Sequence, residues 1–162
     1  MIKIIVAVDE NGAIGRNNDL LFHIKDDLKN FKILTTNNTV VMGRNTWESL
    51  PIKPLPNREN IVLTTTENEL SGAKVLHSFE ELEVYLKCYD KDVYIMGGSS
   101  IYNQIMEKGL VDEAHVTFVK EVVEDADTFI SIKKLKELLP REKYITTFEQ
   151  GNIKADYIIL SK

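Results

Sequence analysis

The chain has 162 residues, of which 43% are hydrophobic and 28% are charged, values that are ordinary for a globular protein with one core. The formal net charge is −5 and no block of like charges occurs, which excludes binding to nucleic acid or to a membrane surface through bulk positive charge. The chain has one cysteine, which allows no internal disulfide, and no apolar run approaches the ~20 residues of a membrane span, so we expect a cytoplasmic protein. Its three histidines are far apart and lack metal-ligand spacing, so we expect no metal.

Apolar runs alternate with helical patterns along the chain. The first run, residues 2–8, is short and leads directly into Asp9 and Glu10, so we interpret it as a strand rather than as a signal peptide. Further strands are predicted at residues 39–42, 61–65, 74–76, 92–96 and 114–119, and helices at residues 25–34, 44–50, 79–87 and 99–108. In the third helix, Ser78 is the predicted N-cap, and Glu81 is placed to complete a capping box. Continuous apolar strands separated by helices indicate a mostly parallel sheet with helices on both faces.

The C-terminal part of the chain has a different pattern. Residues 143–150 and 153–161 flank a Gly-Asn turn, which is typical of a β-hairpin. The predicted fold is therefore α/β: a single domain over residues 1–162, with a central, mostly parallel eight-stranded sheet and a C-terminal antiparallel hairpin. Three loops are predicted, at residues 9–23, 51–59 and 120–131, and loops of such length are often functional.

Two junctions share one pattern, in which a buried strand is followed by glycine, polar residues and a helix. Gly43 and Arg44 stand at the first junction, and Gly97 and Gly98 stand at the second. Each junction offers backbone N–H groups and a helix dipole to an anion, so the pair suits a ligand with separated phosphates, such as a dinucleotide. The guanidinium of Arg44 suits a phosphate monoester, which favours NADPH over NADH. Either junction alone also fits a simple turn, and neither is the dinucleotide fingerprint or a P-loop.

Asp27 and Phe31 project from the same face of the predicted helix at residues 25–34, four residues apart. A carboxylate beside an aromatic ring is partly desolvated, which raises its pKa, and it can pair with a flat, amidine-like heterocycle through two hydrogen bonds. The alternative is that Asp26 and Asp27 are first-turn acids that favour the helix dipole, an interpretation that suits Asp26.

Arg58 and Thr117 are further candidates. Arg58 follows a loop that its prolines restrict, so it is placed to bind a carboxylate, although a surface arginine without a ligand also fits the sequence. The hydroxyl of Thr117 either points into a pocket or simply suits a β-strand.

Taken together, these residues resemble those of the bacterial-type dihydrofolate reductases over nearly the whole chain. The landmarks are residues 6–9, 14–15, 27–28, 31–32, 41–49, 54–58, 60–64, 97–98, 101–102, 117 and 127–129. Each landmark is short, but the ordered set with compatible spacings is highly specific. The resemblance implies NADPH-dependent reduction of 7,8-dihydrofolate to 5,6,7,8-tetrahydrofolate, by hydride transfer to pterin C6 and protonation at N5. It also implies a monomer that antifolates inhibit.

The resemblance also assigns roles at the substrate site. Asp27 would bind the pterin 2-amino group and ring nitrogen, with Thr117 hydrogen-bonded behind it, and Arg58 would hold the glutamate α-carboxylate. Leu20 and Phe22 of the mobile lid, residues 9–23, would join Asp27 and Thr117 as catalytic residues. The remaining substrate contacts would come from Ile5, Val6, Ala7, Leu28, Phe31, Leu50, Leu55, Met96 and Tyr102.

For the cofactor, the resemblance implies that Arg44 and Thr65 meet the 2′-phosphate of NADPH, that the Gly97–Gly98 peptide is cis, and that Asp127 steadies one state of the lid. The rest of the cofactor groove would be lined by Ala7, Ile14, Gly15, Gly43, Asn45, Thr46, Thr64, His77, Gly97, Gly98, Ser99, Ser100, Ile101 and Tyr102.

The sequence departs from the family pattern at three places. The common Leu-Pro-Trp of the lid reads Leu20-Leu21-Phe22, the usual proline at the start of the substrate helix is Lys25, and Ser100 stands where a basic residue often follows. Two other hypotheses stay open. One is a related pyrimidine reductase of the riboflavin pathway, against which Asp27, Phe31 and Arg58 argue; the other is a module that senses NADPH or pterin without turnover, which the change at Phe22 allows.

Overall fold

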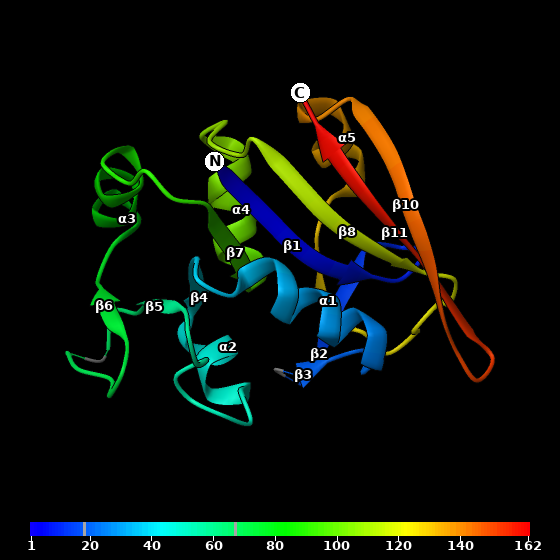
Figure 1. The fold of residues 1–162 in the computed structure, drawn as a ribbon, viewed down its shortest axis with the longest axis horizontal. Helices are drawn as coiled ribbons and strands as arrows, with labels where there is room; N and C mark the ends of the chain where they lie inside the picture. The colour runs from blue at the N-terminus through cyan, green and yellow to red at the C-terminus, as the bar shows by residue number, and fades with distance from the viewer. Residues whose placement is uncertain (18, 67) are drawn as a thin grey trace.

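The computed structural model describes residues 1–17, 19–66 and 68–162. Its main sheet is built from β1 (Ile2–Val8), β4 (Thr39–Gly43), β5 (Glu59–Leu63), β6 (Lys74–Leu76), β7 (Val93–Gly97), β8 (Glu113–Val119), β10 (Arg141–Gln150) and β11 (Ile153–Ser161). These eight strands lie in the order β10-β11-β8-β1-β7-β4-β5-β6 (Figure 1). Neighbours from β8 to β6 pair in parallel, whereas β11 pairs antiparallel with both β8 and β10. The mostly parallel sheet and the C-terminal antiparallel pair are thus confirmed.

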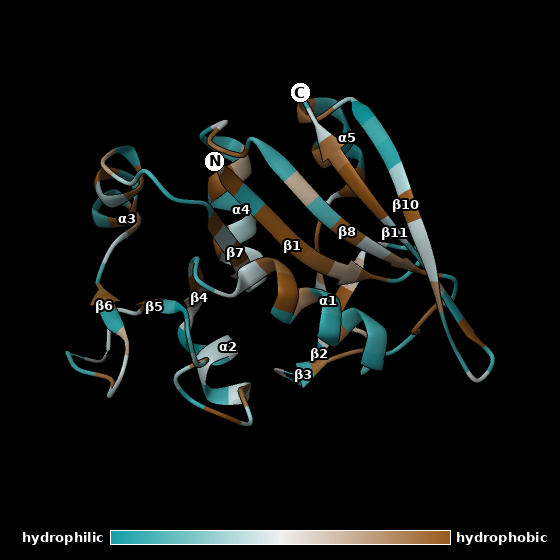
Figure 2. Ribbon diagram, viewed as in Figure 1, coloured by the Kyte–Doolittle hydropathy of each residue, from teal (hydrophilic) through white to brown (hydrophobic). Residues whose placement is uncertain are grey.

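The helices cover both faces of the sheet and create two apolar layers. They are α1 (Lys25–Thr35), α2 (Arg44–Ser49), α3 (Phe79–Lys87), α4 (Ser99–Glu107) and α5 (Ile132–Leu138). The larger layer packs Ile4 and Val8 of β1 against α3, α4 and α5, while the other packs Met42 of β4 against Trp47 of α2. Figure 2 shows the result of this coverage, because β1 is mostly hydrophobic whereas the edge strand β10 is largely hydrophilic. Within the described residues, no helix is long and apolar enough to cross a membrane.

Two of the predicted loops contain strands. The segments β2 (Ala13–Arg16), β3 (Asp19–Leu20) and β9 (Thr128–Phe129) form a second sheet in the order β3-β2-β9. The prediction of residues 9–23 and 120–131 as structureless was therefore wrong, although residue 18 of the first loop lies outside the described residues. These strands have two to four residues each. β3 pairs locally with β2, and β2 pairs in turn with β9, more than 100 residues later in the chain. Local periodicity cannot reveal such pairing.

Other differences concern helix and strand ends. The strand predicted at residues 61–65 lies at Glu59–Leu63, which leaves Thr64 and Thr65 in the turn that follows it. Helix α5 was not predicted, although Ser131 caps it by accepting a hydrogen bond from the backbone N–H of Lys134 at 3.2 Å. The predicted cap of α3 is confirmed, since Ser78 Oγ accepts from the backbone N–H of Glu81 at 3.1 Å. The carboxylate of Glu81 returns to the N–H of His77 at 2.8 Å, one residue before the cap.

Candidate active site

The two glycine junctions lie side by side at the carboxyl edge of the sheet. Strands β4 and β7 are neighbours, with Met42 in register with Gly97. A Cβ atom on Gly43 would lie 3.8 Å from the nitrogen of Gly98, so the two junctions, predicted separately, form one site. Gly97 has a φ of +117°, and a Cβ atom there would lie 3.3 Å from the ring of Tyr102, so this position requires glycine. The Gly97–Gly98 peptide is cis, as the resemblance implies.

The first turns of α2 and α4 offer backbone N–H groups to a ligand. The N-cap residues of these helices are Gly43 and Gly98, and neither supplies a side-chain cap. Helices α3 and α5, by contrast, are capped by the hydroxyls of Ser78 and Ser131. A Cβ atom on Gly98 would meet no atom within 4 Å, so the space in front of α4 is open to a ligand. This geometry suits the close approach of a phosphate group.

A cavity of about 440 Å³ opens beside these junctions. Five of the predicted cofactor residues line it, namely Arg44, Thr64, Thr65, His77 and Ser100. Sequence reasoning missed its other lining residues, which are Leu63, Thr66, Ser78, Phe79 and Gln104. None of the described residues in this lining is acidic, and most carry a hydrogen-bond donor, so the cavity fits a phosphorylated ligand. The run of three threonines after β5 was a signal for it, since that strand ends at the same edge of the sheet as β4.

The remaining predicted cofactor residues do not line this cavity. Asn45 and Thr46 lie in α2, and Ser99 begins α4, whose Ile101 and Tyr102 are buried. The hydroxyl of Tyr102 donates to the carbonyl oxygen of Ile5 at 2.8 Å, which ties α4 to β1. The others lie on β1 and β2, and they are Ala7, Ile14 and Gly15. Among the residues that the structure describes, no group of His, Cys, Asp and Glu side chains could hold a metal ion.

Asp27 and Thr117 form a short hydrogen bond between α1 and β8. Thr117 Oγ1 donates to Asp27 Oδ1 at 2.6 Å, and Thr117 is only 4% exposed. Burial raises the pKa of the Asp27 carboxyl, and the hydrogen bond from Thr117 opposes this change. Ala7 of β1 lies in register with Thr117, so it is the neighbouring residue on the sheet. Asp26, the other first-turn acid, is exposed.

Arg58 comes from the loop before β5 and lies beside the C-terminal end of the same helix, α1. Its Nε donates to the carbonyl of Pro56 at 2.9 Å, and its Nη1 donates to the hydroxyl of Thr35 at 3.1 Å. Its guanidinium carbon lies 5.9 Å from the centre of the Phe31 ring. Asp27, Phe31 and Thr35 follow one another at intervals of four residues, so the carboxylate and the arginine lie roughly 12 Å apart along the helix at ~1.5 Å per residue. A ligand that reaches both groups needs a planar hydrogen-bonding head and a remote anionic tail.

The predicted apolar substrate residues and the two catalytic lid residues, Leu20 and Phe22, fall into three groups. The first is partly buried against the core layer of β4 and α2, and it comprises Ile5, Leu50, Leu55 and Met96. Two others are solvent-exposed, Leu28 on α1 at 43% and Leu20 on β3 at 53%. The side chains of Val6 and Phe22 lie elsewhere: Val6 packs in the opposite core layer, and Phe22 packs against a cluster of Ile24, Val119 and Ala155. Only the backbone of Val6 can therefore face this site.

The lid is attached to the loop of residues 120–127. The backbone N–H of Asn17 donates to Asp127 Oδ2 at 2.9 Å, and the N–H of Asp127 donates to the carbonyl of Gly15 at 3.0 Å. Hydrogen bonds from Asn17 and from the hydroxyl of Thr128 lower the pKa of Asp127. Arg16 forms an ion pair with Asp125 at 2.8 Å.

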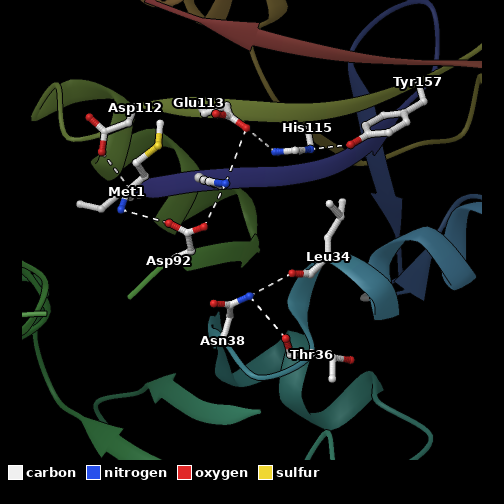
Figure 3. A network of polar contacts seen from close by, with 11 residues as sticks. Met1, Leu34, Thr36, Asn38, Asp92, Asp112, Glu113, His115 and Tyr157 are labelled. Atoms are coloured by element: carbon white, nitrogen blue, oxygen red, sulfur yellow. Dashed lines mark hydrogen bonds and ion pairs between the residues drawn. The ribbon is translucent and has the colours of Figure 1, made fainter. Parts of the chain in front are cut away.

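A polar network that includes Glu113, His115 and Tyr157 lies on the sheet (Figure 3). His115, two residues before Thr117 on β8, contacts the hydroxyl of Tyr157 through Nδ1 at 2.6 Å and a carboxylate oxygen of Glu113 through Nε2 at 2.6 Å. Lys3 extends the network from Glu113 to Asp92. Burial lowers the pKa of His115, and the neighbouring Glu113 opposes this effect. This network could not be predicted from the sequence, because its members on β8 meet partners from β1, β11 and the residue before β7.

The fold and site define a class: an α/β protein with two glycine junctions and a donor-lined cavity at the carboxyl edge of its sheet, and a partly buried carboxylate on α1, features that suit a nucleotide-dependent oxidoreductase. The dihydrofolate reductase family model matches residues 1–161. The chain is 39% identical over 120 residues to the dihydrofolate reductase of Staphylococcus aureus, covering 74% of this chain and 71% of that one. It is 40% identical over 134 residues to the enzyme of Neisseria gonorrhoeae, covering 82% and 81%.

A solved structure agrees with these sequence matches. Dihydrofolate reductase from Enterococcus faecalis, complexed with NADP(H) and RAB-propyl, superposes with a TM-score of 0.82 at 32% identity, covering 99% of this chain and 95% of that one. The chain therefore belongs to the dihydrofolate reductase family, a family of NADP-dependent oxidoreductases. This result favours the folate reductase over the pyrimidine reductase that the sequence had left open.

Proposed function

We propose that the chain reduces 7,8-dihydrofolate to 5,6,7,8-tetrahydrofolate and uses NADPH as its cofactor. The observation that carries the proposal is the partly buried Asp27–Thr117 pair, with Arg58 bonded to Thr35 two helical turns further along α1. Dihydrofolate has the matching features, because its pterin presents an amidine-like edge and its glutamate presents a carboxylate. The structural relative from E. faecalis, which is named as complexed with NADP(H), supports the choice of cofactor.

Asp27 holds and orients the pterin in this proposal. Thr117 occupies one oxygen of the carboxylate, Oδ1, which leaves Oδ2 to accept from the pterin 2-amino group and ring nitrogen. Phe31 and Leu28 on α1, with Ile5 and Leu50 opposite, supply the apolar walls. Orientation matters because the positioning of two reactants accounts for a large part of catalysis in such reactions.

When bound, NADPH supplies the hydride that is added to pterin C6. The proton for N5 comes through water, and Asp27 tunes the ring to which that proton is added. Phe22 has no N–H to hold such a water, and its side chain packs against Ile24, Val119 and Ala155. The water therefore depends on other partners in this protein. Leu20, whose side chain is exposed, is free to cover the bound ligands and exclude bulk solvent, and Phe22 anchors the end of the lid in its apolar cluster.

The cofactor residues divide by the part of NADPH that they bind. Arg44, Thr65 and His77 in the 440 Å³ cavity hold the 2′-phosphate. Gly43 and the Gly97–Gly98 peptide admit the pyrophosphate to the first turns of α2 and α4. The nicotinamide end is bounded by residues of β1, β2 and α4, namely Ala7, Ile14, Gly15, Ile101 and Tyr102. We further propose that the protein is a cytoplasmic monomer and that antifolates compete for Asp27.

The experiment that tests this function compares two asparagine variants of neighbouring acids. Asp27→Asn should lose at least ~100-fold in dihydrofolate-dependent NADPH oxidation at neutral pH, because a positioned ionisable group contributes at least that much. Asp26→Asn is the matched control, since Asp26 is exposed on the same helical turn and should keep full activity. Near-normal turnover by Asp27→Asn would remove the carboxylate from the mechanism.

A further inference from the structure

Asp9 is a completely buried carboxylate that bonds to two separate segments of the chain. It follows directly after β1 and is 0% exposed. Its Oδ1 accepts from the backbone N–H groups of Asn11 and Ala13, both at 2.8 Å. Its Oδ2 accepts from the backbone N–H of Val123 at 2.9 Å. Three such bonds compensate a buried charge, and the loss of any one leaves a polar group without a partner away from water.

The two segments are the base of the lid and the loop of residues 120–127. Backbone contacts from the lid to this loop and to Ile130 just after it reinforce their attachment. The N–H of Glu10 donates to the carbonyl of Glu121 at 3.0 Å, and the N–H of Ile130 donates to the carbonyl of Gly12 at 2.9 Å. Gly12 has a φ of +79°, and a Cβ atom there would lie 2.5 Å from the oxygen of Ile130. Only glycine fits this contact, so the turn at residues 9–13 has one position against the loop.

This turn leads directly into β2, which carries two of the residues proposed to bound the nicotinamide, Ile14 and Gly15. The lid has a second attachment to the same loop, at Asp127. That attachment is exposed, whereas the bond from Val123 to the buried Asp9 carboxylate is partly buried, and exposed contacts open more readily than buried ones. Asp9 therefore attaches the base of the lid to this loop at a less exposed point than Asp127 does.

We propose that Asp9 is a positioning residue for the hydride-transfer reaction: by binding Ala13 with one oxygen and Val123 with the other, it fixes where β2 stands against the cofactor. This proposal rests on the proposed function of the site. It concerns a residue that touches neither substrate nor cofactor and acts through Ile14 and Gly15.

Asp9→Asn tests the coupling, because an amide has only one acceptor oxygen. That oxygen can serve Asn11 and Ala13 or it can serve Val123, and the NH₂ group then faces an N–H donor on the other side. The matched control is Asp112→Asn. Asp112 also accepts a backbone N–H, that of Ile2 at 2.9 Å, but it lies at the opposite end of β1.

For Asp9→Asn, we expect the single-turnover rate of hydride transfer at saturating ligands to fall at least ~10-fold, because small misplacements of reacting groups are costly. NADPH binding should weaken, while dihydrofolate binding should stay within about twofold. Hydrogen exchange of the protein without ligands should rise both in residues 10–17 and in residues 121–128. The control should show none of these changes, even if its melting temperature falls equally.

Two results would overturn the proposal. One is a hydride-transfer rate and an NADPH affinity within about twofold of the control, which would give Asp9 only a structural role. The other is faster exchange in one of the two segments alone. If Asp9→Asn does not fold, Val123→Pro removes the donor on the loop side and carries the same expectations. If the wild-type protein does not reduce dihydrofolate, the proposed function fails, and the exchange and NADPH-binding measurements still decide the role of Asp9.

Discussion

Thr117→Val tests whether the hydroxyl of Thr117 stabilises the ionised form of Asp27. Burial raises the pKa of Asp27, and the bond from Thr117 is the interaction that opposes this. Removing the hydroxyl should therefore raise the pKa of Asp27 further. The variant should also be less stable than the wild type, and by more at a pH where Asp27 is ionised.

The expected size of the effect follows from the geometry. The two oxygens lie 2.6 Å apart and Thr117 is 4% exposed, so water does not compete effectively for this bond. A hydrogen bond to a charged group contributes ~1.5–3 kcal/mol, and one between neutral groups contributes ~0.5–1.5 kcal/mol. Valine has nearly the shape of threonine, so the lost bond dominates the cost. We expect a loss of roughly 2 kcal/mol when Asp27 is ionised and about 1 kcal/mol when it is protonated.

Urea unfolding across the pH range measures the loss of stability. The carboxyl ¹³C signal of Asp27 in an NMR titration measures the change in its pKa. A loss of about 2 kcal/mol should lower the urea midpoint by roughly 1 M. Thr147→Val is the control, because Thr147 Oγ1 donates to Asp156 at 2.7 Å on the partly exposed hairpin, where the bond should contribute under ~1 kcal/mol. An unchanged pKa of Asp27 in Thr117→Val would refute the reasoning.

Three further variants test other parts of the site. Arg44→Ala should weaken the binding of NADPH by ~10-fold or more and that of NADH much less, since it removes a charged hydrogen bond to the 2′-phosphate. Equal losses of affinity for the two cofactors in a fluorescence titration would remove that role. Arg58→Gln should raise the KM for dihydrofolate but not for a dihydropterin without the glutamate tail, and equal effects on both would contradict its contact with the tail. Burial lowers the pKa of His115 from 6.5. Below about that pH, the unfolded chain therefore binds a proton that the folded chain does not, and the free energy of unfolding should fall as the pH decreases. His115→Gln should abolish that decrease in urea unfolding, and a persistent slope would assign it to other groups.

The parallel sheet could be predicted because its signals are local. Each central strand is buried on both faces, so it appears in the sequence as a continuous apolar run, and Ser78 marks the start of α3 by its own hydrogen bond. The short strands β2, β3 and β9 could not be predicted in this way. Each is too short to show a periodic pattern. β2 pairs with the adjacent β3 and also with β9, more than 100 residues later, and nothing in either segment alone specifies that second pairing.

The same distinction applies to the site. The glycine junctions carry a local pattern, so both could be found, but their adjacency depends on β4 and β7 being neighbours in the sheet. The resemblance to a known family supplied the pairing of Asp27 with Thr117, which are 90 residues apart. The network around His115 and the double contact of Asp9 were missed, because backbone N–H donors and cross-strand partners leave no residue pattern in the sequence.

The loss of NADPH absorbance with and without dihydrofolate, with NADH measured in parallel, tests the central claim most directly. The account predicts oxidation that requires dihydrofolate and prefers NADPH, because Asp27 and Arg58 bind the one ligand and the cavity around Arg44 binds the other. Binding of NADPH or folate without any oxidation would contradict the assignment as a reductase and would indicate a module that senses these ligands.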